Sequence, residues 1–296
     1  MPEYIKIILA GTLAGTISRL LLLRLDYRQY PGYPHGVVAH ISLGVIASAL
    51  GAVLIPALLK QDYTAVTFLA LAAQQFREIR QMERTTLENL EINEMVKRGN
   101  DYIEGIARTF EARNYLVMAT AVVVSACTYL GGLLGGVLSA IGCIVISRTY
   151  MTGKSIGQIC QVLPATVNFD GALLKVDQIG IMNVGLPEMR EKILKEALAV
   201  RIVPRSASAM AIINDLGQRM AIAHTAAVIL GTKKEIDMAE LTPLARKDID
   251  SGEVGLFILP MHKDMEALLL AVRRTPVLES SRSKPLATQA GRMARR

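Results

Sequence analysis

The stretch Asn114–Ser147, NYLVMATAVVVSACTYLGGLLGGVLSAIGCIVIS, carries no charged side chain over its 34 residues. A single helix of that length would be about 51 Å long, whereas the hydrocarbon core of a bilayer is roughly 30 Å thick. Four glycines lie near its middle, within residues 131–136, where a helix can turn at little steric cost. We therefore predict a transmembrane helical hairpin over residues 114–150, with spans of about 115–130 and 133–149.

Three more apolar segments precede the hairpin, within residues 1–76. The first, Tyr4–Leu23, contains the pair Gly11 and Gly15, whose spacing lets another helix approach closely. The second is Val37–Leu58, and the third, Tyr63–Phe76, is a marginal span because of its length. We expect helix packing at a set of glycines: Gly11, Gly15, Gly131, Gly132, Gly135 and Gly136.

The distribution of basic residues predicts the orientation of the spans. Lys and Arg are frequent in the segments 24–36, 77–113 and after 147, and they are sparse elsewhere in the first half. If residues 63–76 cross the membrane, all three basic segments lie on one side, as the positive-inside rule requires. We therefore expect about five transmembrane helices in the cell membrane, with the N-terminus outside and the C-terminal domain cytoplasmic.

The predicted spans carry few polar groups, and two of their ionisable residues, Arg19 and His40, bear on function. Arg19, near the end of the first span, is expected to extend its guanidinium to the interface; a buried functional arginine is the alternative. His40, near the start of the second span, is expected to make a polar contact at the interface. The four strongest spans contain no acid, which disfavours a proton-coupled transporter.

A charged segment over residues 77–113 is predicted to be helical and cytoplasmic. Its last part, from Asp101, has the apolar face Tyr102, Ile103, Ile106 and Phe110. This pattern is typical of an amphipathic helix lying along a membrane interface. Gly105 within it costs about 1 kcal/mol relative to Ala in a helix, and a close backbone contact is the expected reason for it.

The hexapeptide in this helix is Tyr102, Ile103, Glu104, Gly105, Ile106 and Ala107. It resembles the signature of the YIEGIA family, membrane proteins of endospore-forming Firmicutes, and the length and layout of the chain agree with that family. The resemblance implies a role in sporulation or spore germination and a small soluble protein as a capping subunit. It assigns no catalytic residue.

After Tyr150 the composition changes to that of a soluble domain. Short apolar runs alternate with helical patterns over residues 151–280, which predicts a cytoplasmic α/β domain. Strands are expected at 172–184, 200–203, 226–230, 254–259 and, at an edge, 276–278. Helices are expected at about 187–198, 206–222, 238–250 and 263–273. Residues 281–296 are predicted to be a disordered basic tail that touches anionic lipid.

The motifs that carry chemistry are missing from this sequence. It has no Walker loop, no dinucleotide fingerprint, no nucleophile elbow and no His or Cys set with metal-ligand spacing. A net charge of +7 with no Trp favours contact with anionic lipid over nucleic acid. We therefore expect no catalytic activity, no cofactor, no metal and no nucleic-acid partner.

Three hypotheses of function follow from the sequence. The first is a non-enzymatic membrane assembly factor that forms a homo-oligomer through its small-residue faces and binds the soluble capping subunit. The second is a channel or transporter component with a cytoplasmic regulatory domain, in which the hairpin lies near a pore. The third is a membrane-tethered enzyme or nucleotide sensor, for which Gly231–Lys234 is the weak candidate site.

Overall fold

The structure is a computed structural model, which describes residues 2–26, 34–92, 94–151, 153–235, 238–239 and 241–282. The chain divides into two compact units. The helical unit comprises Met1–Thr85 and Ile106–Thr152, and the α/β unit comprises Thr86–Gly105 and Gly153–Arg296. Each unit is described by itself below.

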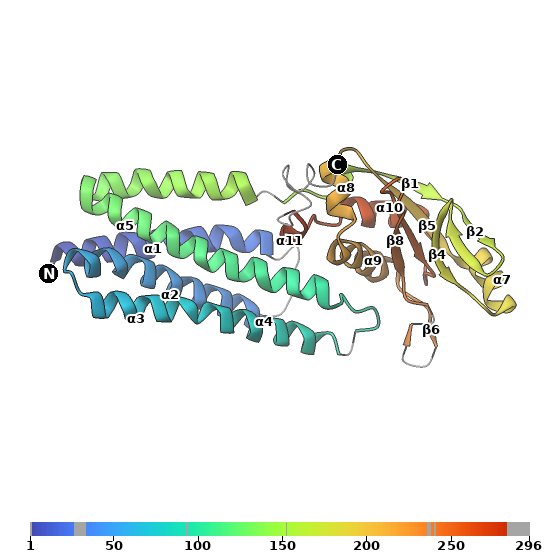
Figure 1. Ribbon diagram of the computed structural model, residues 1–296, viewed down its shortest axis with the longest axis horizontal. Coiled ribbons are helices and arrows are strands. Elements are labelled where there is room, and N and C mark those ends of the chain that lie inside the picture. Colours follow the sequence, from blue (N-terminus) through green and yellow to red (C-terminus); the bar gives the residue numbers. More distant parts are fainter. Residues whose placement is uncertain are drawn as a thin grey trace. The chain divides into compact units, whose positions relative to one another are not determined.

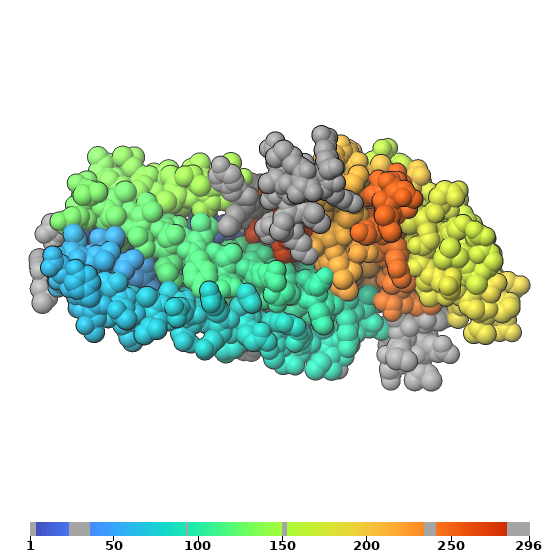
Figure 2. All heavy atoms as spheres, viewed as in Figure 1, coloured from blue at the N-terminus to red at the C-terminus, as the bar shows by residue number. Residues whose placement is uncertain are grey.

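The helical unit is built from five helices (Figure 1). They are α1 (Pro2–Asp26), α2 (Pro34–Leu59), α3 (Tyr63–Gln74), α4 (Phe76–Leu90, to Thr85 within this unit) and α5 (Asn100–Met151, from Ile106 within this unit). Gln75, between α3 and α4, keeps right-handed helical torsion angles. The two helices therefore follow one another along the same face of the unit, as Figure 2 shows in cyan and teal.

Helix α5 turns back on itself at the predicted position. Gly131 (φ −120°, ψ 15°) and Gly132 (φ 64°, ψ −163°) leave helical geometry, and a positive φ is favourable for glycine because it has no Cβ. The two arms then lie side by side, since a Cβ on Gly135 would be 2.7 Å from the carbonyl oxygen of Cys127. The predicted hairpin, with its turn between two apolar spans, is confirmed.

Three helical segments are long and apolar enough to cross a membrane among the described residues. They are Tyr4–Leu23, Gly36–Leu59 and Asn100–Thr149, of 20, 24 and 50 residues. The third contains both arms of the hairpin. Helix α3, with 12 residues, is not among them, in agreement with the marginal length of that segment in the sequence.

The helical unit exposes many apolar side chains and buries polar ones together with apolar ones. Leu130, Leu133, Leu134 and Leu138 are between 63% and 82% exposed on α5. The buried side chains of the unit include many polar ones, namely Ser18, Arg19, His40, Ser48, Glu83, Thr109, Arg113, Asn114, Thr120, Ser125, Thr128 and Ser147. A soluble bundle has the opposite distribution, because water drives apolar surface inward.

The α/β unit contains two antiparallel sheets. The four-stranded sheet has the order β1 (Cys160–Ala165), β5 (Leu198–Pro204), β9 (Val254–Ile258), β8 (Leu244–Lys247). The three-stranded sheet has the order β2 (Val167–Asp170), β3 (Leu173–Val176), β4 (Ile179–Asn183), and β6 (Lys234–Glu235) pairs with β7 (Met238–Ala239). Its helices are α6 (Ile156–Ile159), α7 (Pro187–Glu196), α8 (Ala207–Ile213), α9 (Leu216–Leu230), α10 (Met265–Arg274) and α11 (Glu279–Arg282).

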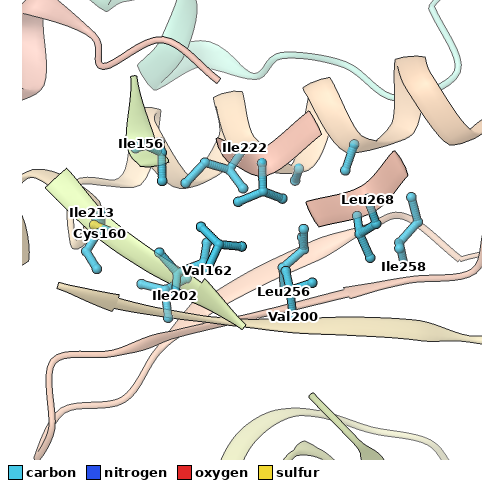
Figure 3. Close-up of a cluster of buried hydrophobic side chains, with 14 of the residues drawn as sticks. Ile156, Cys160, Val162, Val200, Ile202, Ile213, Ile222, Leu256, Ile258 and Leu268 are labelled. Atoms are coloured by element: carbon cyan, nitrogen blue, oxygen red, sulfur yellow. The ribbon is translucent and has the colours of Figure 1, made fainter. Parts of the chain in front are cut away.

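One hydrophobic core fills the space between the four-stranded sheet and the helices. Figure 3 shows Val162, Val200 and Leu256 of the sheet gathered with Ile222 of α9 and Leu268 of α10. All five are 2% exposed or less. At about 25 cal/mol per Å² of apolar surface, burial of this kind is the main stabilising term of the unit.

A second core lies on the other face of the same sheet. Ala199 of β5 and Phe257 of β9 pack with Leu174 and Ile181 of the three-stranded sheet and with Ile193 of α7. Both central strands therefore bury both faces, alternate residues contributing to alternate cores. The α/β unit thus has three layers: helices, the four-stranded sheet, and the three-stranded sheet with α7.

Several sequence-based predictions for this unit are correct. The strands at 200–203 and 254–259 and the helices at 187–198 and 263–273 correspond to β5, β9, α7 and α10. The predicted mixture of helices and strands in this region is confirmed. Every strand pairing within its two larger sheets is antiparallel.

Other predictions are wrong. Residues 226–230 are the end of α9 and not a strand, and residues 238–250 form β7 and β8 and not a helix. The run 172–184 is the hairpin of β3 and β4, which turns at Asp177 (φ 53°). Residues 276–278 make only a single bridge, from Pro276 to Ser155. Of the predicted tail 281–296, the first two residues belong to α11, and 283–296 lie outside the described residues.

Candidate functional site

The hexapeptide lies in the first two turns of α5, and most of it is buried. Tyr102, Ile103, Ile106 and Ala107 are 5% exposed or less, and Gly105 is buried too. The helix continues without a break to Gly131. The segment is therefore the beginning of the long apolar helix itself.

Gly105 is in close contact with α11. A Cβ at this position would lie 2.4 Å from the Oγ atom of Ser280 and 3.1 Å from its Cβ. Glycine is therefore favoured here, although it costs about 1 kcal/mol in a helix relative to Ala. The close backbone contact expected from the sequence is thus observed, and its partner is the C-terminal helix of the same unit.

The chain before α5 is also held by the α/β unit. A ring nitrogen of His224 in α9, Nδ1, donates to the carbonyl oxygen of Val96 at 2.8 Å. A Cβ on Gly99 (φ 82°) would be 2.7 Å from the sulfur of Met220, and one on Gly217 would be 3.0 Å from the carbonyl oxygen of Asp101. Residues 86–105 thus pack along α9.

An ion-pair network stabilises the same segment. Glu91 is 4% exposed and accepts hydrogen bonds from the backbone N–H groups of Arg98 (2.9 Å) and Gly99 (3.4 Å). Arg98 also donates through Nη1 to Glu91 and Glu94. His224 lies 3.9 Å from Glu94, but burial is the main reason why its pKa lies below the ordinary value, so it stays neutral at pH 7.

The hexapeptide belongs to both units. Tyr102–Gly105 are part of the α/β unit, and Ile106 and Ala107 are part of the helical unit. The boundary between the two units therefore falls within the hexapeptide. Its burial favours a structural role for these six residues.

The predicted packing glycines fall into two classes. A Cβ on Gly11 would be 2.8 Å from the carbonyl oxygen of Ala121, one on Gly15 would be 2.6 Å from Ser48, and one on Gly136 would be 2.2 Å from Thr128. Gly11, Gly15, Gly135 and Gly136 thus pack helices against each other within the chain. Gly131 and Gly132 have no atom within 4 Å of that position; they form the turn.

A group of ionisable side chains lies inside the helical unit. Arg19 of α1 is 1% exposed, and its guanidinium carbon is 5.6 Å from the ring centre of Phe110 in α5. His40 of α2 stacks on the same ring at 4.6 Å, and its Nε2 atom is 3.4 Å from Oε1 of Glu83 in α4. Three helices thus contribute polar side chains to this buried polar cluster, and a fourth, α5, contributes the ring of Phe110.

One expectation from the sequence is corrected here. Arg19 does not extend to an interface, because its stem passes over Gly44, where a Cβ would be 2.5 Å from Cγ of the arginine. The sequence also offered no acid within the strongest spans, and Glu83 of the amphipathic helix α4 supplies one, 8% exposed. The signal that could have found it is Leu87, one helical turn after Glu83, which predicts that this face of α4 is buried.

The weak phosphate candidate at Gly231–Lys234 has a different role in the structure. Gly231 (φ 70°) ends α9, and Thr232 makes a single bridge to Pro260. The amine of Lys233 bonds to the carboxylate of Glu196, which holds the pKa of that exposed carboxyl below its usual range. The side chain of Lys234 lies outside the described residues.

Comparison with known proteins shows the family. A family model described as YIEGIA protein matches residues 7–288, a range that includes the hexapeptide and both units. The chain belongs to the YIEGIA family. The Bacillus subtilis (strain 168) protein called uncharacterized protein YphB is 41% identical to this YIEGIA protein over 285 residues, 96% of either chain. No solved structure matches.

Proposed function

We propose that this YIEGIA protein is a five-span integral membrane protein that anchors a cytoplasmic α/β domain, and that it acts as a non-enzymatic part of a sporulation- or germination-associated assembly. The observation that carries the membrane part is the exposed apolar surface of the helical unit, with Leu130 82% exposed and Phe68 69% exposed. Lipid solvates such a surface at no cost, whereas water does not.

The proposed number of spans follows from counting how often the chain crosses the membrane. Helices α1 and α2, the segment Tyr63–Phe76 that contains α3, and the two arms of α5 give five crossings. With five, the basic segments 24–36, 77–113 and 148–154 share one side of the membrane, which the positive-inside rule assigns to the cytoplasm. The N-terminus and the turn at Gly131 are then outside.

The assembly role needs a surface that the chain does not use for itself. Gly11 and Gly15 are occupied by α2 and α5, so the small-residue face of α1 does not serve an oligomer. The second arm of α5 is largely exposed, and Gly142 on it has no neighbour within 4 Å of a Cβ position. This arm is the surface on which we place the homo-oligomer, and the α/β unit is where we place the small soluble capping subunit.

Two experiments test this proposal. Reporter fusions after residue 154 should be active in the cytoplasm, and fusions at residue 132 should be active outside. Crosslinking from the α/β unit in intact cells, followed by mass spectrometry, should identify a small soluble partner. A strictly monomeric protein that captures no such partner contradicts the assembly role and leaves the topology intact.

The buried polar cluster favours a second candidate, a channel or transporter component. Ionisable residues inside a membrane bundle are costly and commonly belong to transport pathways, and here Arg19, His40 and Glu83 lie together. Flux of ions across liposomes that contain the purified protein tests it. Flux that the variant Arg19→Gln abolishes supports this candidate, and absence of flux for every ion tried contradicts it.

A further inference from the structure

The chain enters the α/β unit beside the C-terminal end of α10. Ser155 forms an antiparallel bridge with Pro276, and the backbone N–H of Val277 donates to the carbonyl oxygen of Lys154 at 2.8 Å. Helix α6 follows directly and packs against α10. The first residues of the unit are therefore fixed to the segment that follows α10.

Basic side chains gather around α6 at this end of the unit. A Cβ on Gly157 would be 3.0 Å from the Cβ atom of Arg273, and the backbone N–H of Arg205 donates to the carbonyl oxygen of Ile159 at 3.1 Å. Arg273 also donates through Nη2 to the carbonyl oxygen of Val162 in β1, at 3.1 Å. The exposed basic residues of this end are called the entry surface; they are Lys154, Arg205, Arg273 and Arg274.

The entry surface has an excess of positive charge. The acids of the three described helices at this end, α6, α10 and α11, are Glu266 in the first turn of α10 and Glu279, and α11 adds the basic Arg282. Arginines in the last turn of α10 also stabilise that helix through its dipole. This role accounts for the two arginines of α10, but not for Lys154 and Arg205, which lie outside that helix.

The covalent chain limits the distance between Lys154 and the end of α5. Lys154 follows Met151, the last residue of α5, by three residues, which span about 11 Å at most. Ser147 ends the charge-free stretch, and the last turn of the helix beyond it adds about 6 Å. In the proposed membrane, the headgroup layer is roughly 5–7 Å thick on each side, and its negative potential extends about 8 Å further. The chain therefore keeps Lys154 at about the range of that potential or closer.

We propose that the entry surface binds the phosphate headgroups of anionic phospholipids in the cytoplasmic leaflet. Guanidiniums match phosphate oxygens with paired donors, and Leu270, 46% exposed one turn before Arg274, adds an apolar contact at the interface. The short connection favours lipid over a soluble acidic protein, because it keeps a membrane at a high local concentration. The proposal rests on the membrane location proposed above and is separate from the assembly role. It concerns the folded unit and not the predicted tail 281–296.

The experiment measures amide hydrogen exchange of the full-length protein in lipid nanodiscs. One kind of nanodisc contains phosphatidylcholine alone, and the other contains phosphatidylglycerol as one third of its lipid. We expect segments 154–160 and 268–277 to exchange at least three-fold more slowly with the anionic lipid. The difference should vanish at high salt, because salt screens contacts between exposed charges.

Two variants with the same loss of charge show whether the entry surface is responsible. The first replaces three of its residues and spares Arg273, which also supports β1; it is Lys154→Gln, Arg205→Gln, Arg274→Gln. We expect this variant to lose the difference between the two kinds of nanodisc. The control replaces three exposed basic residues elsewhere in the α/β unit and should keep the difference; it is Lys195→Gln, Arg246→Gln, Lys247→Gln.

Three results overturn this proposal alone. The first is equal exchange of these segments in both kinds of nanodisc, which would leave the membrane location and the assembly role intact. The second is a difference that the first variant keeps or that the control also loses, which would show a general attraction of a basic protein. The third is slower exchange on addition of polyglutamate without an effect of phosphatidylglycerol, which would assign the surface to an acidic protein. A protein that enters neither kind of nanodisc overturns the proposal together with the membrane location.

Discussion

The two units of this YIEGIA protein place polar and apolar side chains in opposite ways. In the α/β unit, Val200, Leu256 and Phe257 are fully buried and ion pairs such as Lys233–Glu196 lie at the surface. In the helical unit, Arg19 and Arg113 are buried and the leucines of α5 are exposed. The proposed membrane location accounts for both patterns by the same physical rule, since each surface would then match a different solvent.

The difference teaches which interactions stabilise each unit. Apolar burial stabilises the α/β unit against water. In the membrane that we propose for the helical unit, lipid would remove most of that driving force, so close packing and internal polar contacts would hold the helices together. The contacts of Gly11, Gly15 and Gly136 and the hydrogen bond of Ser125 to the carbonyl of Ile7 at 3.3 Å are of this kind.

The largest expected effect is a cavity in the α/β unit. Phe257 is 0% exposed between the two sheets, and Phe257→Ala should lower the free energy of unfolding by about 3–5 kcal/mol, because the transfer and cavity terms add. Chemical denaturation followed by circular dichroism measures it. Ile249→Ala, at a 79% exposed position, is the control and should change stability by less than about 0.5 kcal/mol.

The comparison is tested next by placing the same charge on both surfaces. Leu138 in α5 is 63% exposed and Ile249 in the α/β unit is 79% exposed. Leu138→Arg should cost about 2.5–3.5 kcal/mol of membrane insertion, whereas Ile249→Arg should be nearly neutral. The fraction of each variant that enters the membrane measures this. Equal results at the two sites would remove the distinction between the surfaces.

A smaller effect is expected at the hexapeptide. In Gly105→Ala the new methyl group clashes with Ser280, which should cost about 1–3 kcal/mol by overpacking, offset in part by the better helix propensity of Ala. Ser280→Gly should restore stability in the double variant, as a thermodynamic cycle would show. If the single variant is as stable as the native protein, the contact does not constrain Gly105.

The smallest effect is a pH dependence of the α/β unit. Because burial lowers the pKa of His224 in the folded state, the unfolded state binds more protons just below pH 6.5, the ordinary value. The contribution of this residue is therefore complete above about pH 6.5 and is lost as the pH falls toward the folded pKa, by at most about 1.4 kcal/mol per pH unit.

His224→Asn serves as the matched variant for that pH dependence. Its amide can still donate to the carbonyl of Val96, as Nδ1 does at 2.8 Å, but it does not titrate. Denaturation at pH 5 and at pH 7.5 should show a smaller difference for this variant than for the native protein. The same difference in both proteins would contradict the assignment of the pH dependence to His224.

Local patterns predict the elements that depend on local physics. The charge-free stretch predicts the hairpin because it is too long for one span, and its glycines mark the turn, where Gly132 has a positive φ. Pro187 with Glu188 predicts the start of α7, and Pro260 predicts the end of β9. These signals act within one or two turns of the chain and need no distant partner.

The failures come from tertiary context. A run of five apolar residues at 226–230 fits a buried strand as well as the end of a buried helix. In the structure this run is the last part of α9, a helix that begins after the capping side chain of Asp215. Arg19 resembled an interfacial arginine because Gly44 and Phe110, which accommodate it, lie far away in the sequence. The buried polar cluster draws on four helices, so no short stretch of sequence reveals it.

The central claim is that lipid surrounds the helical unit and water surrounds the α/β unit. The most direct test measures which solvent reaches exposed leucines of each unit. Spin labels at Leu138 and, for comparison, at Leu186 of the α/β unit, which is 69% exposed, are introduced into a protein without its three native cysteines and reconstituted into lipid. The account predicts that the label at 138 is relaxed by oxygen and not by a water-soluble nickel complex, and that the label at 186 shows the reverse. A label at 138 that the nickel complex reaches as readily as the label at 186 would contradict the account.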